Sequence, residues 1–246
     1  MTFSQILLRE PDPLVFHLFG DESIGRGVVV YGIIVFNLSD VNAAAEDFRN
    51  LISSYGLPPE TRFHCREVFA GDARNKTSWR HMSEKQVWEV AEQLLLKLNT
   101  HRPQYCLGIV YRDAFPSVLA SGSGSKRIDV QEEHLYPLAF AGALQPLVDL
   151  ELVSPDIESH LWFDPLNKKL EFWGAGALQV QRVFSHNNLI IEKVDDGKPL
   201  LLDAADIFSY VAGRAVSRED SRHKAKCQEL LGLCHPRIGI GSWIPP

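Results

Sequence analysis

The sequence predicts an α/β fold, with a mixed sheet that begins with an antiparallel hairpin and is flanked by helices. Two strand-like apolar runs, 14–20 and 28–36, are joined by a short turn at 24–27 that contains two glycines, as expected for a hairpin. Helical and strand-like segments then follow in mixed order. The 246 residues show no internal repeat and no change of composition that would mark a linker. We therefore expect one domain, residues 1–246.

Caps and apolar spacing predict the helices. Asp40 is placed to cap a helix over 41–55, which Gly56 and two following prolines would end. Ser83 and Gln86 match a capping box at the start of a helix over 84–99. Further helices are expected over residues 131–150 (bent near Pro137 and Pro146), 176–184 and 203–217, the last continuing or restarting to about residue 231.

Short apolar runs predict the remaining strands, over residues 62–66, 105–111, 157–163 and 189–194. Residues 121–127, SGSGSKR, have the composition of a flexible loop. They lack the spacing of a phosphate-binding loop, which argues against nucleotide binding there.

Composition and charge exclude several classes of protein. No apolar run is long enough to span a bilayer, and the N-terminus lacks the features of a secretory signal, so we expect a cytoplasmic protein. The four cysteines are mostly scattered, as in a reducing compartment. The formal net charge of −6 argues against general coating by nucleic acid, so a nucleic-acid partner would need a local basic surface.

A zinc site is the less favoured interpretation of one further group. It consists of His223, Cys227, Cys234 and His235. The spacing matches no tight Cys-x-x-Cys pattern, and the intervening residues have the composition of an ordinary helix.

Three acids stand out by their setting. Asp21 follows the first apolar run, and Asp164 follows the strand predicted over 157–163. Asp206 lies in a helix of small residues that could approach the sheet closely, and Asp203 lies three residues earlier on the same helical face. The alternative is that each acid is only a cap or turn residue.

If Asp21, Asp164 and Asp206 converge, they need a cation. Two unit charges ~4 Å apart repel by about 4 kcal/mol at an effective dielectric constant near 20. Ligands that are all oxygen favour Mg²⁺ or Mn²⁺ over zinc. Such ions could activate water and stabilise the leaving oxygen in phosphodiester cleavage.

The same acids lie in motifs that resemble a known family. The sequence Asp21-Glu22-Ser23-Ile24-Gly25 is similar to an early Asp-Glu-Ser-Gly motif. Residues 203–206, Asp-Ala-Ala-Asp, are similar to a late Gln-x-Ala-Asp motif that opens a helix. Together they resemble the family called domain of unknown function 3800, whose fold is thought to be RNase H-like.

The resemblance implies an RNase H-like acidic centre formed by Asp21, Asp164 and Asp206. It adds Glu22 as a candidate catalytic residue. Aspartate stands where the family has glutamine at position 203, so Asp203 could be a metal ligand, a group supporting a ligand, or a helix cap. The resemblance names no substrate.

Basic residues follow the late motif at intervals of four: Arg214, Arg218, Arg222 and Lys226. On a continuous helix they could hold a nucleic-acid backbone, although a solvated, salt-bridged helix face is the favoured interpretation. His64 and Glu67 are weaker candidates for roles near the site, His64 as a proton carrier or a structural histidine.

We therefore expect a Mg²⁺- or Mn²⁺-dependent nuclease or related phosphoryl-transfer enzyme acting on DNA or RNA. The alternative is a catalytically silent RNase H-like module that binds nucleic acid or a protein. The sequence leaves the oligomeric state open.

Overall fold

The computed structural model describes residues 15–25, 27–114, 118–120, 127–129, 135–163, 189–192, 199–218 and 223–240. The predictions for Asp164, Arg222, the helix over 176–184 and loop residues 121–126 lie outside them.

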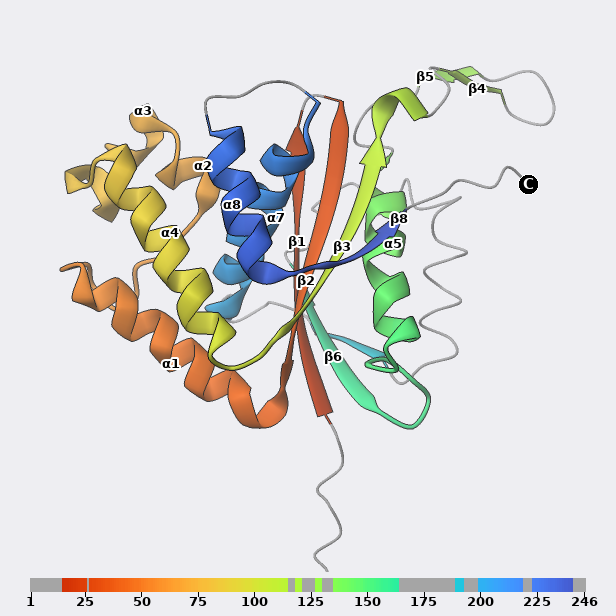
Figure 1. Cartoon of the computed structure of the whole chain (residues 1–246), viewed down its shortest axis with the longest axis horizontal. Coiled ribbons are helices and arrows are strands. Elements are labelled where there is room, and N and C mark those ends of the chain that lie inside the picture. The colour runs from red at the N-terminus through yellow and green to blue at the C-terminus, as the bar shows by residue number, and fades with distance from the viewer. Residues whose placement is uncertain are drawn as a thin grey trace, which may run out of the picture.

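A six-stranded mixed sheet forms the centre of the fold, in the order β7-β6-β1-β2-β3-β8 (Figure 1). Strand β2 pairs antiparallel with both β1 and β3, whereas β6 pairs parallel with β1, β7 with β6 and β8 with β3. Their bounds are β1 Val15–Gly25, β2 Val28–Asn37, β3 Gln104–Tyr111, β6 Glu158–Phe163, β7 Leu189–Glu192 and β8 Arg237–Ile240. A separate hairpin joins β4 (Val118–Ala120) to β5 (Arg127–Asp129). The predicted fold class is confirmed, and the arrangement is consistent with an RNase H-like fold.

Helices cover both faces of this sheet. In Figure 1, α5 lies on one side, and α1, α4, α7 and α8 lie on the other. The helices are α1 Leu38–Ser54, α2 Cys65–Val68, α3 Gly71–Arg74, α4 Glu84–Asn99, α5 Tyr136–Asp149, α7 Leu201–Val216 and α8 Lys224–Cys234, with 3₁₀ turns η1 Ser78–His81 and η2 Arg112–Ala114.

Local signals account for the elements that were predicted well. The Ser83–Gln86 capping box opens α4 as expected, with both of its reciprocal contacts present. The hairpin is also confirmed, but β1 does not stop at Asp21, because pairing with β2 continues to Gly25 opposite Val28. Asp21 therefore lies inside a strand and not at its end.

Three boundaries differ from the prediction. Helix α1 begins at Leu38, so Asp40 lies in its first turn and is not its cap. Helix α5 begins only at Tyr136, because Pro137 suits the first turn of a helix, while Pro146 is accommodated inside it. The strand predicted over 62–66 is wrong: residues 61–64 are irregular, and α2 begins at Cys65.

The core has two layers because neighbouring residues of a strand face opposite sides of the sheet. Phe19 packs with α1, α4, α7 and α8, whereas Leu18 packs with α5. On the α5 side, Gly108 of β3 permits close contact: a Cβ there would lie 1.8 Å from the carbonyl oxygen of Ala139. On the other side, Asp21 shares the orientation of Phe19 and thus faces α7.

Candidate acidic site

Helix α7 lies directly on β1 and β2 because its residues are small. Ser209 Oγ donates a hydrogen bond to the carbonyl oxygen of Asp21, 2.8 Å away. A Cβ at Gly213 would lie 2.6 Å from Ser23 Oγ, and a Cβ at Gly32 would lie 2.5 Å from Ser209 Oγ. The narrow helix predicted from the sequence is therefore closely packed against the strand that carries Asp21.

This packing brings Asp21 and Asp206 together. Burial raises the pKa of Asp21 well above its usual value, and the negative charges of Asp206 and Glu22 raise it further. Burial also raises the pKa of Asp206 to about 6, although the backbone N–H of Cys65 donates to its Oδ2 at 2.8 Å and opposes the shift. Asp21 and Asp206 are both half-buried residues.

The buried thiol of Cys65 lies beside the same pair. Its pKa is raised by burial and by the charges of Asp206 and Asp21. The thiol is therefore held in its neutral form next to two acids, which makes it a poor nucleophile at neutral pH.

Asp203 has a different environment, although it lies one turn from Asp206. It is buried, and Arg62 forms an ion pair with it through Nη2 and Oδ1, 2.6 Å apart. Arg62 Nε also donates to both of its oxygens, at 3.0 and 2.8 Å. The backbone N–H of Phe63 donates to Oδ2 at 2.8 Å. Asp203 is thus engaged as an anchor for residues 62–63, and it is not the helix cap, a position that Leu200 occupies.

The two carboxylates of α7 explain why residues 62–66 do not form a strand. Asp203 accepts the N–H of Phe63, and Asp206 accepts the N–H of Cys65. Two carboxylates three residues apart on one helix thereby accept the N–H groups of alternate residues in this segment. In a sheet, the backbone of a neighbouring strand would have accepted those N–H groups. Arg62 and Cys65 are site residues that the sequence did not reveal.

Glu22 interacts with groups on both sides of the sheet. Strand alternation turns its side chain to the α5 side of the sheet, where its charge raises the pKa of the buried Tyr136 hydroxyl. Its carboxyl also forms a side-chain hydrogen bond with the Asp21 carboxyl and raises the pKa of Asp21.

Asp164 lies outside the described residues. Phe163, the residue before it, is opposite Gly20, the residue before Asp21, in the parallel pairing of β6 with β1. Among the described residues, no three His, Cys, Asp or Glu side chains lie close enough to hold a metal ion. In the group for which zinc was the less favoured interpretation, Cys227 and Cys234 are buried free thiols, and His223 pairs with Glu84 at 2.6 Å.

The predicted basic stripe does not lie on one helix, because α7 ends at Val216 and α8 begins at Lys224. Arg214 stacks on the ring of Tyr210, 4.6 Å from its centroid. Arg218 pairs with Asp113. Lys226 pairs with Glu92 at 2.9 Å and with Glu229 at 3.2 Å. Arg222 lies outside the described residues. The three described cations are thus engaged within the chain.

Comparison with known proteins adds no relative: no protein-family model and no curated sequence matches this chain. In the part of the chain that the structure describes, no helix has the length and apolar character needed to cross a membrane.

The raised pKa of Asp206 predicts a pH-dependent stability. Between about pH 4 and pH 6 the folded chain holds a proton at Asp206 that the unfolded chain, with an ordinary Asp pKa near 3.8, has released. The stability due to this residue is therefore present below about pH 4 and lost as the pH rises through about 6. Asp206→Asn is expected to raise the free energy of unfolding by about 1–3 kcal/mol at pH 7.5 and to change it little at pH 4.

Urea denaturation at both pH values, in the presence of a chelator, measures this effect. Asp72→Asn is the matched control, because Asp72 is exposed on α3. Equal stability changes for Asp206→Asn at pH 4 and pH 7.5 would contradict the assignment.

Proposed function

We propose that the protein is a divalent-metal-dependent nuclease or related phosphoryl-transfer enzyme, in which Asp21 and Asp206 are metal ligands. The observation that carries the proposal is this pair of partly buried, mutually repelling carboxylates. Neither has a cationic side chain in an ion pair with it among the described residues.

The neighbouring Asp203 provides the contrast. Where a carboxylate of α7 has a structural role, the chain supplies Arg62 to neutralise it. Asp21 accepts the backbone N–H of Glu22 and Asp206 accepts that of Cys65, each at 2.8 Å, and the neutral Cys65 thiol also donates to Asp206. Two carboxylates that have no cationic side-chain partner among the described residues suit a hard divalent cation, because oxygen ligands with net negative charge favour Mg²⁺ and Mn²⁺.

A third ligand belongs to the proposal. Asp164 is bonded to Phe163, which pairs in register with the residue before Asp21. We therefore include Asp164 in the site. Glu22 is not included as a ligand, because strand alternation starts its side chain on the α5 side, but its carboxyl contacts that of Asp21. Asp203 supports the site by holding residues 62–63.

The cation would supply the chemistry of water activation and of charge stabilisation on the leaving oxygen. The chain's own part is to hold the ligands. The Cys65 N–H fixes one oxygen of Asp206, and the Ser209 hydroxyl fixes the β1 backbone at Asp21. This support limits the freedom of both carboxylates before any ion arrives.

The test is cleavage of labelled single- and double-stranded DNA and RNA by the full chain with Mg²⁺ or Mn²⁺. We expect cleavage of at least one substrate that stops when a chelator removes the metal and returns when metal is restored. Cleavage that persists in excess chelator would contradict a metal-dependent reaction.

A second candidate is a silent module that keeps the fold and binds nucleic acid or a protein. It is favoured by the lack, among the described residues, of a third metal-binding side chain beside Asp21 and Asp206. Salt-sensitive nucleic-acid binding without any change of thermal stability on adding Mn²⁺ would select this candidate over the enzyme.

We also propose that the protein acts in the cytoplasm. All four cysteines are buried free thiols, which is typical of a reducing compartment.

A further inference from the structure

A local excess of positive charge borders the acidic pair. Residues 61–82, here called the basic segment, contain five Lys and Arg residues against Glu67 and Asp72, a net charge of +3. The whole chain has a formal net charge of −6. The basic segment is therefore positively charged, although the chain as a whole is negatively charged.

The basic segment is firmly attached to the site. Asp203 and Asp206 bind the backbone of Phe63 and Cys65, as described above. Farther along the segment, Trp79 is 1% exposed, and its Nε1 donates to the carbonyl oxygen of Arg62 at 2.9 Å. The rings of Trp79 and Phe63 pack edge to face with centroids 4.9 Å apart. These contacts hold the segment in a fixed position, which lowers the entropy cost of binding a ligand.

Several cations of this segment are available to a ligand. The side chains of Arg66, Lys76 and Arg80 are exposed, and none forms an ion pair within the part of the chain that the structure describes. The nearest described partner is His81, whose Nε2 lies 3.1 Å from Arg80 Nε. By contrast, the predicted basic residues Arg218 and Lys226 already have acidic partners.

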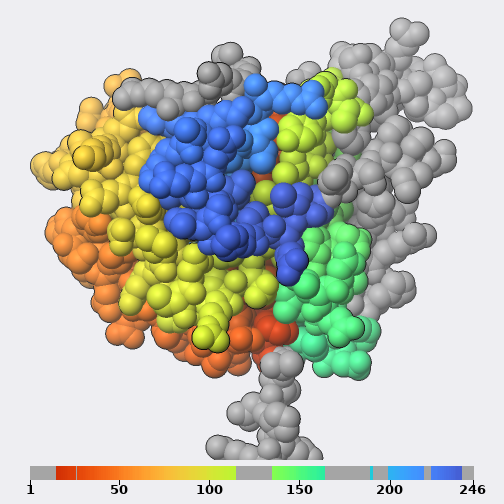
Figure 2. Space-filling view, in the orientation of Figure 1, coloured from red at the N-terminus to blue at the C-terminus, as the bar shows by residue number. Residues whose placement is uncertain are grey.

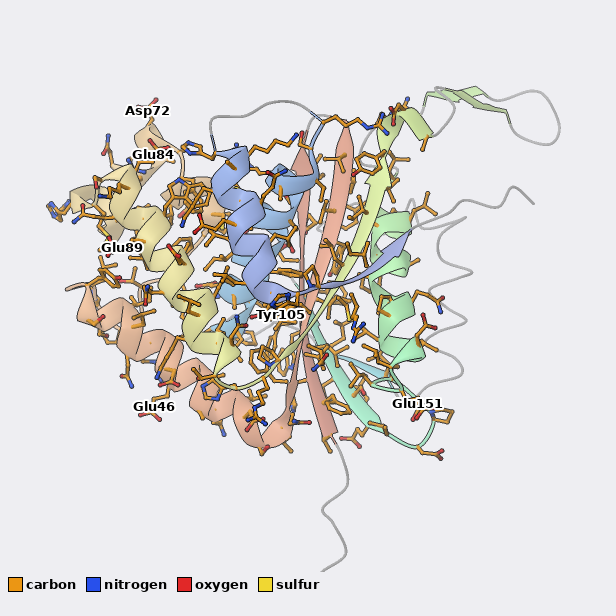
Figure 3. All side chains as sticks on the ribbon, viewed as in Figure 1. Glu46, Asp72, Glu84, Glu89, Tyr105 and Glu151 are labelled. Carbon is orange, nitrogen blue, oxygen red and sulfur yellow. The ribbon has the colours of Figure 1, made fainter. Side chains whose placement is uncertain are left out.

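The basic segment also lies close to helix α7. In Figure 1, α2 lies beside α7, the helix that carries Asp206, and α3 lies farther out. Figure 2 shows the orange and yellow residues, which include the segment, on the surface beside the blue α8. In Figure 3, Asp72 on α3 and Glu84 at the start of α4 mark this outer corner. The exposed His64 is close enough for its charge to act on both Asp203 and Asp206.

We infer that the basic segment binds the phosphodiester backbone of a nucleic-acid strand and holds it beside Asp21 and Asp206. The inference rests on the proposed function, since it assigns the substrate-binding surface of that site. A phosphate approaching two carboxylates is repelled, so flanking cations are needed to hold the strand. Because Arg66, Lys76 and Arg80 are exposed and form no ion pair within the described structure, they can neutralise phosphates without breaking a salt bridge there; Arg80 donates only to the neighbouring His81.

The test measures binding of labelled single-stranded DNA, single-stranded RNA and duplex DNA by fluorescence anisotropy, in a chelator so that no metal takes part. The test variant is Arg66→Ala with Arg80→Ala. The matched control is Arg49→Ala with Arg237→Ala, which removes the same charge from exposed positions on α1 and β8.

We expect the test variant to bind at least about fivefold more weakly than wild type at 0.1 M salt. The slope of its log affinity against log salt concentration should become less steep by about 1–2, as expected for the loss of two phosphate contacts. The control should stay within about twofold of wild type. The three substrates show whether the surface prefers one strand type.

Equal weakening by both double variants would overturn the inference, because net charge alone would then explain it. Wild type that binds none of the three substrates would overturn it too. Either failure leaves the proposed function to be judged separately, because Mn²⁺ binding at Asp21 and Asp206 is measured without nucleic acid.

Discussion

Asp203→Ala is expected to lower the free energy of unfolding by about 2 kcal/mol, since leaving a buried hydrogen-bonding group without its partner costs about 1–3 kcal/mol. The substitution removes the acceptor of the buried Phe63 N–H and the partner of Arg62. Asp203→Asn should cost less, because its amide oxygen still accepts from Phe63. Urea denaturation measures all three proteins.

A chemical probe reports the same change locally. Cys65 is 1% exposed in a segment that Asp203 helps to hold against α7. In Asp203→Ala this cysteine should react with a thiol reagent before the other three, which mass spectrometry identifies.

Asp47→Ala is the control for a surface ion pair. Asp47 pairs with Lys97 at 3.3 Å and with His101 at 2.8 Å, and its side chain is 27% exposed. Its loss should cost under about 1 kcal/mol. If Asp203→Ala cost no more than Asp47→Ala, Asp203 would not be the anchor described here.

The second large effect concerns activity. If the protein cleaves a phosphodiester, Asp21→Asn and Asp206→Asn should each lower the rate by at least about 100-fold, because each removes a charged ligand from the metal. Asp203→Asn should lower it less, since Asp203 acts only through the segment that positions Asp206. Initial rates at saturating Mn²⁺ measure the difference.

Glu46→Gln, which removes one charge from an exposed position on α1, serves as the control and should retain the wild-type rate. Retention of more than about a tenth of the rate in Asp206→Asn would show that the acidic pair does not hold the reacting metal.

Sequence reasoning succeeded where local signals decide the structure. The hairpin and the Ser83–Gln86 box both depend on signals within a few residues, and both elements formed, although Ile24 and Gly25 of the predicted turn lie in β1. It failed for residues 62–66 because their N–H groups are satisfied by side chains of α7, more than a hundred residues away in sequence. Nothing near Phe63 signals that partner.

In the candidate site, too, local spacing was predicted correctly and contacts between distant residues were not. The i, i+3 spacing placed Asp203 and Asp206 on one helical face, and both reach the same segment of chain. Their different roles depend on Arg62, which no spacing rule connects to Asp203. The position of Asp21 within β1, with Glu22 turned to the other face, depended on how far β2 extends the hairpin.

The central claim is that Asp21 and Asp206 bind one divalent cation together. A crystal of the full chain soaked in Mn²⁺ and measured for anomalous scattering tests it most directly. We expect a manganese peak about 2 Å from a carboxylate oxygen of each residue. At saturating Mn²⁺, a map with no peak between these two carboxylates would contradict the account.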